Sequence, residues 1–311
     1  MKVENLREAY GQALVEIGKR NKDVVVLEAD LGKSTRSCLF QEVYPERYFE
    51  MGIAEQNMAS TAAGLALVGK IPFIHSFAVF AAGRAYDQIR QAISIPGLNV
   101  RICGSSCGLS DFGDGSTHQA IDDVALMRAI PNMTVLVPVD AVEVKKMVEA
   151  VVEYKGPVYI RINRNDLPVY TPEDLECRIG GIYTVREGQD VVVFANGVMV
   201  SKAMEAAKVL QKEGISVEVV NVSTVKPLDA DALAEKAKGF KGAVVAEEHG
   251  IIGGLCSAVS LALKEKKVEV PLEFVAVEDR FGTSASNYED LLKHYGLSSE
   301  NIYRKVKCLL K

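Results

Sequence analysis

The segment Gly52-Ile-Ala-Glu-Gln-Asn57 places a carboxylate, Glu55, between a predicted short strand and a predicted helix. At such a junction, the positive end of the helix dipole and the unpaired backbone N–H groups of the first turn stabilise a negative charge. A glutamate here either caps its helix or acts as an acid or base toward a ligand. The segment by itself leaves both interpretations open.

A glycine-rich loop, residues 111–119, holds a second pair of polar side chains, Asp114 and His118. This loop follows a predicted strand and precedes a predicted helix. Ligands of open α/β sheets bind on that side, beyond the carboxyl ends of the strands. His118 is therefore either a loop histidine with local hydrogen bonds or a proton-transfer group with Asp114 beside it.

Two aromatic and two basic residues also follow predicted strands. Phe77 and Phe80 have a spacing that suits the binding of a flat ring, although they also suit an apolar core. Arg161 and Arg164 close the last strand of the first half of the chain. A pair of guanidinium groups in this position suits a phosphate or a carboxylate, and the alternative is a pair of surface cations.

These residues are positioned by an alternation of short apolar strands and longer amphipathic helices along the whole chain. Most of the strands are continuously apolar, which indicates parallel sheets covered on both faces. The periodicity lapses at 166–189, where proline and glycine are frequent. The pattern predicts the α/β class, with two doubly wound, mainly parallel domains at 1–165 and 190–311 and a linker at 166–189.

The composition is typical of a folded globular chain: 311 residues, 48% hydrophobic, 25% charged, with a formal net charge of -5. A net negative chain offers no basic surface, so we expect no nucleic-acid partner and no membrane. The six cysteines are too sparse for a disulfide scaffold and predict reduced thiols in the cytoplasm. Cys103 and Cys107 lack a second pair at metal-ligand spacing, so we expect no metal site within the chain.

Taken together and in order, these motifs resemble one known family. The likeness to the pyrimidine-binding domain of transketolases rests on four motifs, Gly52–Met58, Phe77…Phe80…Arg84-Ala-Tyr-Asp-Gln88, Asp114–Gln119 and Pro131–Val135. The second half resembles the C-terminal domain of that superfamily through Val219–Leu228 and Ala246–Gly254. The resemblance covers essentially the whole chain and implies the fold of these two domains.

The resemblance also implies how a cofactor, thiamine diphosphate, would be held. Glu55 matches the glutamate that hydrogen-bonds the aminopyrimidine ring and promotes its imino tautomer, which is proton transfer relayed through the cofactor. Phe77 and Phe80 match the aromatic pocket for that ring. Gly83 departs from the pattern, because some members have a third aromatic residue there.

The same resemblance implies a substrate site. Its positions in this sequence are Asp114, His118, Asp30, Ser34, Arg7 and Arg164. The first two match residues that contact the hydroxyl and carbonyl oxygens of a ketose, and His118 is expected to be catalytic together with Glu55. Arg7, Ser34 and Arg164 match a clamp for the sugar phosphate. Ser106 stands where better-known members have a histidine for the phosphate, which leaves open whether the substrates are phosphorylated.

The family's diphosphate-binding motif, Gly-Asp-Gly followed further along by Asn-Asn, is absent. Gly113-Asp114-Gly115 has no Asn-Asn after it. The resemblance therefore implies the C-terminal subunit of a split transketolase, which transfers a two-carbon ketol unit between ketose and aldose sugars or sugar phosphates, as in the pentose phosphate pathway. An N-terminal partner subunit would share the thiamine diphosphate and hold Mg²⁺ or Ca²⁺, and we expect a homodimer that forms a heterotetramer with it.

Two rival enzymes share the fold and the glutamate. The beta subunit of two-oxoacid dehydrogenases also has the Lys226-Pro227-Leu228 neighbourhood, whereas Asp114–His118 is the pattern of transketolase and of deoxyxylulose phosphate synthase. The synthase is normally one long chain. An alternative of another class is a non-catalytic assembly or regulatory module, and retention of the glutamate, histidine and arginines together favours an enzyme.

Overall fold

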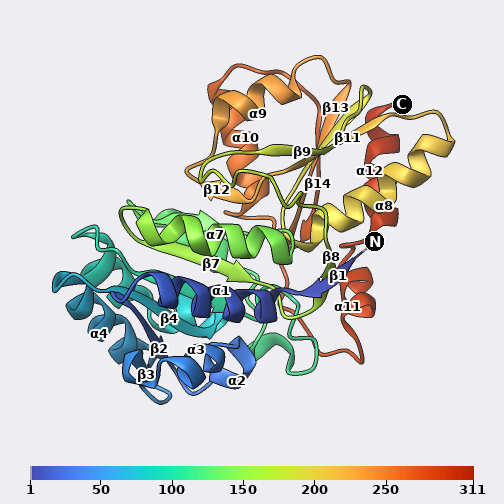
Figure 1. Ribbon diagram of the computed structural model, residues 1–311. Helices are drawn as coiled ribbons and strands as arrows, with labels where there is room; N and C mark the ends of the chain where they lie inside the picture. The colour runs from blue at the N-terminus through green and yellow to red at the C-terminus, as the bar shows by residue number, and fades with distance from the viewer. Residues whose placement is uncertain (1) are drawn as a thin grey trace.

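The predicted alternation of strands and helices runs through residues 2–311, the part of the chain that this computed structural model describes (Figure 1). The first half contains β1 (Val3–Asn5), α1 (Leu6–Arg20), β2 (Val24–Glu28), α2 (Gly32–Thr35), α3 (Cys38–Val43), β3 (Tyr48–Glu50), α4 (Glu55–Leu67), β4 (Ile71–Phe77), α5 (Tyr86–Gln88), β5 (Arg101–Ser105), α6 (Asp123–Ala129), β6 (Thr134–Leu136), α7 (Ala141–Glu153), β7 (Val158–Ile162) and β8 (Asp166–Pro168).

The second half contains β9 (Tyr183–Arg186), β10 (Val191–Ala195), α8 (Val198–Lys212), β11 (Val217–Asn221), β12 (Thr224–Lys226), α9 (Ala230–Ala237), β13 (Gly242–Gly250), α10 (Leu255–Glu265), β14 (Leu272–Val277), α11 (Tyr288–His294) and α12 (Ser299–Leu309). The expected linker segment thus contains two short strands. β8 pairs antiparallel with β1, and β9 pairs antiparallel with β11.

The larger sheet has seven strands in the order β12-β6-β7-β5-β4-β2-β3, and all of its pairs are parallel except β12 with β6. The second sheet has the order β14-β13-β10-β11-β9, with only β9 antiparallel. Central strands such as β2 and β10 are buried at every position because helices cover both faces. The predicted α/β class with mainly parallel sheets is confirmed.

Helix α1 shows how the sequence specifies these elements. Asn5 caps it, because the side-chain oxygen accepts a hydrogen bond from the backbone N–H of Glu8 at 3.1 Å. The helical spacing of the apolar residues in this segment predicts one buried face, and the structure buries all of its members: Leu6, Ala9, Tyr10, Ala13, Leu14 and Ile17. Helix α1 lies beside α7 (Figure 1), and the periodicity of its apolar residues agrees with both the helix and its buried side.

The sequence pattern predicts an ordinary helix over residues 81–94, but this segment is largely π-helical. Phe80–Arg84 and Ile89–Ser94 have the wider π turn, with the short α5 between them. Such wide turns are rare and are often found at functional sites. The spacing of apolar residues does not reveal these turns. A π turn leaves nearly the same positions buried as an α-helical turn would, but it changes which residues face the neighbouring helix.

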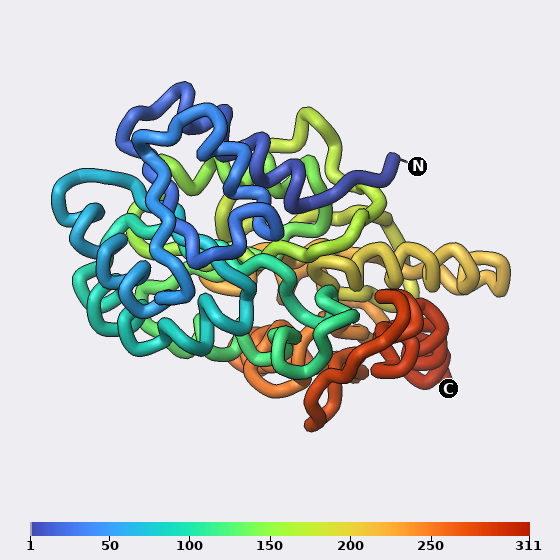
Figure 2. Tube along the Cα trace, turned by 90° about the horizontal axis from the view of Figure 1, so that it is seen from below, coloured from blue at the N-terminus to red at the C-terminus, as the bar shows by residue number. Residues whose placement is uncertain are grey.

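The two halves are connected by more than the chain. β12 comes from the second half and completes the larger sheet, with Thr224 opposite Leu136. The segment before α11 also reaches back, and the backbone N–H of Ala285 donates to the carbonyl of Phe112 at 2.8 Å. Figure 2 shows this red segment beside the green loop. Within residues 2–311, no helix is long and apolar enough to cross a membrane.

Candidate active site

Glu55 is the first residue of α4 and is buried, with 2% of its surface exposed. Its Oε1 accepts a hydrogen bond from Nη1 of Arg84 at 2.7 Å. Its Oε2 is buried and has no hydrogen-bond partner within the described chain. A buried carboxylate oxygen without a donor is costly, so this atom is a natural acceptor for a ligand.

Three rings, from Phe77, Phe80 and His118, lie together and are connected to this carboxylate through Arg84. Phe77 ends β4 and Phe80 begins the first π-helical turn, and their ring planes lie within 14° of each other with centroids 6.2 Å apart. The ring of His118 is steeply inclined to both, at 70° to Phe77 and 78° to Phe80, with its centroid 6.2 Å and 5.3 Å from theirs. Arg84 lies over the Phe80 ring at 4.5 Å and so connects the aromatic group to Glu55.

The expected pair of Asp114 and His118 lies on a tight turn, Gly115–Thr117. Asp114 is exposed. The side chain of His118 contacts its neighbour in the sequence, because its Nδ1 lies 2.9 Å from the hydroxyl of Thr117. The base of this loop is held by Gln119, whose Nε2 donates to the carbonyls of Asp111 at 3.1 Å and Thr283 at 2.9 Å. The second half of the chain therefore shapes the loop that carries His118.

A basic group lies at the other end of the same loop. Arg164 Nη1 donates to Asp111 Oδ2 at 2.6 Å, and Arg7 Nη1 donates to the carbonyl of Ser34 at 2.7 Å. Burial, followed by repulsion from Arg164, lowers the pKa of Arg7. Burial raises the pKa of Asp111, and the adjacent Arg164 partly opposes the rise. The two arginines therefore lie close to each other, but a carboxylate already pairs with one of them.

Asp30 and Ser34 line a surface hollow of about 520 Å³ next to this basic group. Asp30 has a left-handed backbone, with φ of 60°, and its N–H donates to Glu50 Oε1 at 2.9 Å. Such a conformation is uncommon for a residue other than glycine and is found preferentially at functional sites. Its own carboxylate is exposed to solvent.

Two residues considered from the sequence are buried away from this surface. Arg161 is 3% exposed and pairs with Asp123 through Nε and Oδ2 at 2.8 Å. It also donates to the carbonyls of Ala120 and Glu248, so its role here is structural. Ser106 is fully buried, and its hydroxyl has no partner in the part of the chain described. Only Arg164 of the two arginines is accessible to a ligand.

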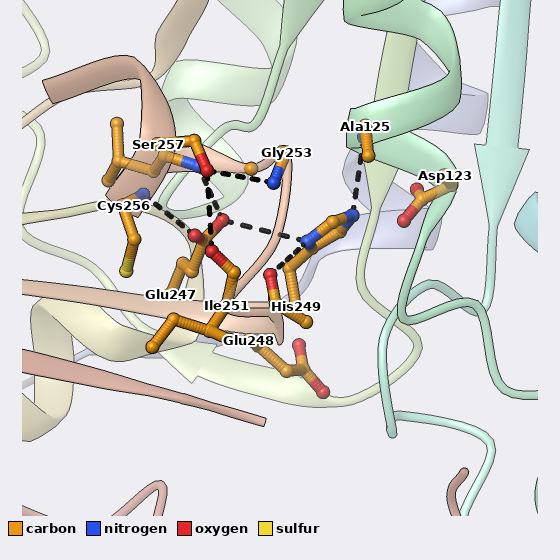
Figure 3. A network of polar contacts seen from close by, with 12 residues as sticks. Asp123, Ala125, Glu247, Glu248, His249, Ile251, Gly253, Cys256 and Ser257 are labelled. Carbon is orange, nitrogen blue, oxygen red and sulfur yellow. Dashed lines mark hydrogen bonds and ion pairs between the residues drawn. The ribbon is translucent and has the colours of Figure 1, made fainter. Parts of the chain in front are cut away.

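The motif Ala246–Gly254 lies at the junction of the two halves (Figure 3). The carboxylate of Glu247 accepts the backbone N–H groups of Leu255 at 2.6 Å and Cys256 at 2.8 Å, and so caps α10. His249 Nε2 accepts the N–H of Ala125 at 3.3 Å, and Nδ1 lies 2.7 Å from the carbonyl of Gly250. The partners assign the proton to Nδ1, and the network joins α6 to β13.

Glu248 of the same motif lies beneath the loop at 107–119. Its Oε1 accepts the N–H of Leu109 and the hydroxyl of Tyr288, each at 2.8 Å. Burial raises the pKa of Glu248 to about 7, although the nearby Arg161 opposes the rise. This carboxylate supports the loop and does not reach the ligand side.

Sequence reasoning missed two contacts of this site. Arg84 follows Phe80 by four residues, and this spacing could have predicted that their side chains stack. The sequence near Arg84 gives no sign that it pairs with Glu55. Asp111 lies in the loop at 111–119, but its pairing with Arg164 depends on segments that are far apart in the sequence. Among residues 2–311, no group of three or more histidine, cysteine or acidic side chains is arranged to hold a metal ion.

Comparisons with known proteins match both halves of the chain. Residues 3–169 match the model of the transketolase pyrimidine-binding domain, and residues 180–302 match that of the transketolase C-terminal domain. A putative transketolase C-terminal section of Methanocaldococcus jannaschii is 40% identical over 305 residues, covering 97% of this chain and 95% of the relative. A 6-deoxy-6-sulfo-D-fructose transketolase subunit of a Clostridium species is 40% identical over 300 residues, covering 96% and 92%.

A solved structure described as a split gene transketolase in an inactive beta4 tetramer superposes with a TM-score of 0.90. It is 46% identical in sequence, and the match covers 98% of each chain. The likeness therefore extends over both halves and over their connection.

Proposed function

This chain belongs to the transketolase family, and on that premise we propose that it is the C-terminal subunit of a split transketolase that transfers a two-carbon ketol unit from a ketose to an aldose. The observation that carries the proposal is the buried carboxylate of Glu55, with one unpartnered oxygen, which Arg84 connects to the parallel rings of Phe77 and Phe80. That combination suits a flat heterocycle with a hydrogen-bond donor on its edge.

The residues present fit the pyrimidine end of thiamine diphosphate. Phe77 and Phe80 would hold the ring flat, and the Glu55 carboxyl group would hydrogen-bond a ring nitrogen, pass it a proton and later take that proton back. When bound, the cofactor supplies the carbanion chemistry of ketol transfer. Diphosphate and metal ligands are assigned to a partner subunit carrying Gly-Asp-Gly…Asn-Asn.

The sugar is proposed to lie along the loop from the rings toward the basic group. His118 would hydrogen-bond its carbonyl oxygen as a catalytic residue, and Asp114 would bind its hydroxyls. The far end of the sugar would face Arg7, Ser34, Arg164 and Asp30. Because Asp111 already pairs with Arg164, this end has less free positive charge than two arginines alone would give, which favours a distal group of low charge over a phosphate dianion.

The proposed assembly is a homodimer that binds two partner subunits. Exposed apolar side chains on and beside α4 suit such an interface, namely Ile53, Leu67, Val68 and Ile95. The related split-gene protein is described as a tetramer of beta subunits, which supports self-association of this kind of chain. Light scattering at tens of micromolar should give at least a dimer, and a strict monomer would contradict this assembly.

The function is tested by measuring thiamine diphosphate binding and ketol transfer with and without a partner. The purified chain, titrated calorimetrically with thiamine diphosphate and Mg²⁺, should bind weakly and have no ketol-transfer activity. Addition of a subunit with the diphosphate-binding motif should restore both. Submicromolar binding by the chain alone, or no activity from the assembled complex with any ketose donor, would refute the split-subunit proposal.

A further inference from the structure

Glu50, the last residue of β3, accepts two backbone hydrogen bonds on one side-chain oxygen. Its Oε1 accepts the N–H of Asp30 at 2.9 Å and the N–H of Gly52 at 3.0 Å. Asp30 belongs to the proposed sugar site, and Gly52 begins the segment that leads to Glu55. One carboxylate oxygen therefore contacts a segment of each part of the candidate site.

The pairing of the strands shows why a side chain is needed at this point. β2 and β3 are parallel, and Glu28 and Glu50 lie opposite each other at the ends of the two strands. Just beyond this pair, the N–H of Met51 donates to the carbonyl of Glu28 at 2.9 Å. The next N–H groups on the two sides, those of Asp30 and Gly52, donate to the Glu50 carboxylate. The side chain thus continues the connection past the end of the strands.

Both donors have a left-handed backbone, with φ of 60° at Asp30 and 67° at Gly52. Glycine adopts this conformation readily, whereas another residue does so at a cost that its surroundings must compensate. A hydrogen bond to an ionised carboxylate is stronger than one to a neutral oxygen. Glu50 therefore helps to hold Asp30 in the turn that directs its side chain.

The path from Gly52 to the cofactor site is short. The N–H of Ala54 donates to the carbonyl of Gly52 at 2.7 Å, which closes a tight turn, and α4 begins at the next residue, Glu55. A displacement of Gly52 therefore displaces the start of α4 and the carboxylate that it carries.

We propose that Glu50 is a positioning residue that fixes the Asp30 segment of the sugar site relative to the Glu55 segment of the cofactor site. This role rests on the proposed function and adds to it a connection between the two parts of the site. Glu50 acts through the backbone of Asp30 and Gly52, so what matters is an acceptor oxygen at this position.

The contacts are tested in the purified full-length chain by NMR measurement of amide hydrogen exchange. Glu50→Ala removes the acceptor, and exchange at Asp30 and Gly52 should become about tenfold faster, the size expected for loss of one hydrogen bond. Glu50→Gln keeps an acceptor oxygen and should stay close to wild type. Glu42→Ala is the matched control, because Glu42 is an exposed glutamate that lines the same hollow as Glu50.

The positioning role is tested by steady-state kinetics of the assembled complex. Glu50→Ala should lower kcat about tenfold through Glu55 and also raise the KM of the ketose donor through Asp30. Glu50→Gln should restore most of both constants, and Glu42→Ala should match wild type. The thermal unfolding midpoint should change little in all three variants, since Glu50 and Glu42 are exposed.

Three results would overturn the role of Glu50. The first is unchanged exchange at either amide in Glu50→Ala, and the second is faster exchange with wild-type kinetic constants. The third is an equal loss of activity in Glu50→Gln and Glu50→Ala. Absence of ketol transfer by the wild-type complex with any ketose donor would instead refute the proposed function, while amide exchange would still decide whether Glu50 holds both segments.

Discussion

Replacing Glu28 with glutamine should remove a large pH dependence from the stability of this protein. Glu28 ends β2 and is fully buried. Its Oε2 accepts the hydroxyls of Thr35 at 2.7 Å and Ser37 at 2.5 Å, and its Oε1 accepts the N–H of Ala29 at 3.0 Å. Burial raises the pKa of this carboxyl from 4.5 to about 7, because these hydrogen bonds compensate only in part for lost hydration.

The raised pKa means that the folded protein binds a proton over a range in which the unfolded chain has released it. Stability should therefore be highest below about pH 4.5 and should fall as the pH rises toward 7. At 1.36 kcal/mol per pKa unit, this difference corresponds to roughly 3 kcal/mol. The Glu28→Gln amide can accept from Ala29 and donate to the two hydroxyls, which are free to rotate, so the variant resembles the protonated wild type at every pH.

The assay is urea unfolding followed by far-UV circular dichroism between pH 4.5 and pH 8, since the chain contains no tryptophan. The variant should match wild type at the acidic end and exceed it by up to roughly 3 kcal/mol at pH 8. Burial also raises the pKa values of Glu143 and Glu248 to about 7. These two groups contribute the same pH dependence to the stability of both proteins, so their contributions cancel when the variant is compared with wild type. Glu265→Gln, at an exposed position of α10, is the control. Parallel pH profiles for wild type and Glu28→Gln would refute the reasoning.

Three further substitutions test the site and its support. Glu55→Gln in the assembled complex should lower turnover about a hundredfold or more, the scale of a general acid or base, while thermal stability changes little; near-normal turnover would leave Glu55 as a helix-start carboxylate. Asp111→Asn frees Arg164 and should raise kcat/KM for a phosphorylated ketose about tenfold relative to its unphosphorylated counterpart; an unchanged ratio would exclude Asp111 as a determinant of charge preference. Arg161→Met leaves Asp123 buried without its cation and should cost about 3 kcal/mol or more in urea unfolding, and a loss below 1 kcal/mol would contradict the account of that pair.

The strands and most helices could be predicted because their signal is local. β7 (Val158–Ile162) is apolar at most positions and is buried throughout, so its continuous apolar run predicts a buried strand there. The π-helical turns within 80–94 could not be predicted. Their hydrogen-bonding pattern places Arg84 over Phe80, but the apolar residues keep nearly the spacing that an ordinary α-helix would have. The sequence therefore predicts that this segment is helical but not which residues it presents to Glu55.

The candidate site also has a part that the sequence predicts and a part that it does not. Phe77, Phe80 and His118 could be grouped in advance because each follows a strand of one parallel sheet, and strand ends meet at one edge. Arg161 and Arg164 stand three residues apart and look equivalent in sequence. One is buried against Asp123 and the other is accessible, because the first points into the sheet packing while the second lies past the end of β7. The aspartate that distinguishes them comes from a distant helix.

The strand β12 restricts how this molecule can move. It is contributed by the second half yet hydrogen-bonded into the sheet of the first, and Lys226 Nζ fastens its end by donating to the carbonyls of Arg128 at 2.9 Å and Ile130 at 2.6 Å. A hinge between the halves would have to break this ladder, so we expect the two halves to move as one body. Access to the site must then be gated by side chains and single loops, whose excursions are fast and small, and not by a slow opening of one domain away from the other.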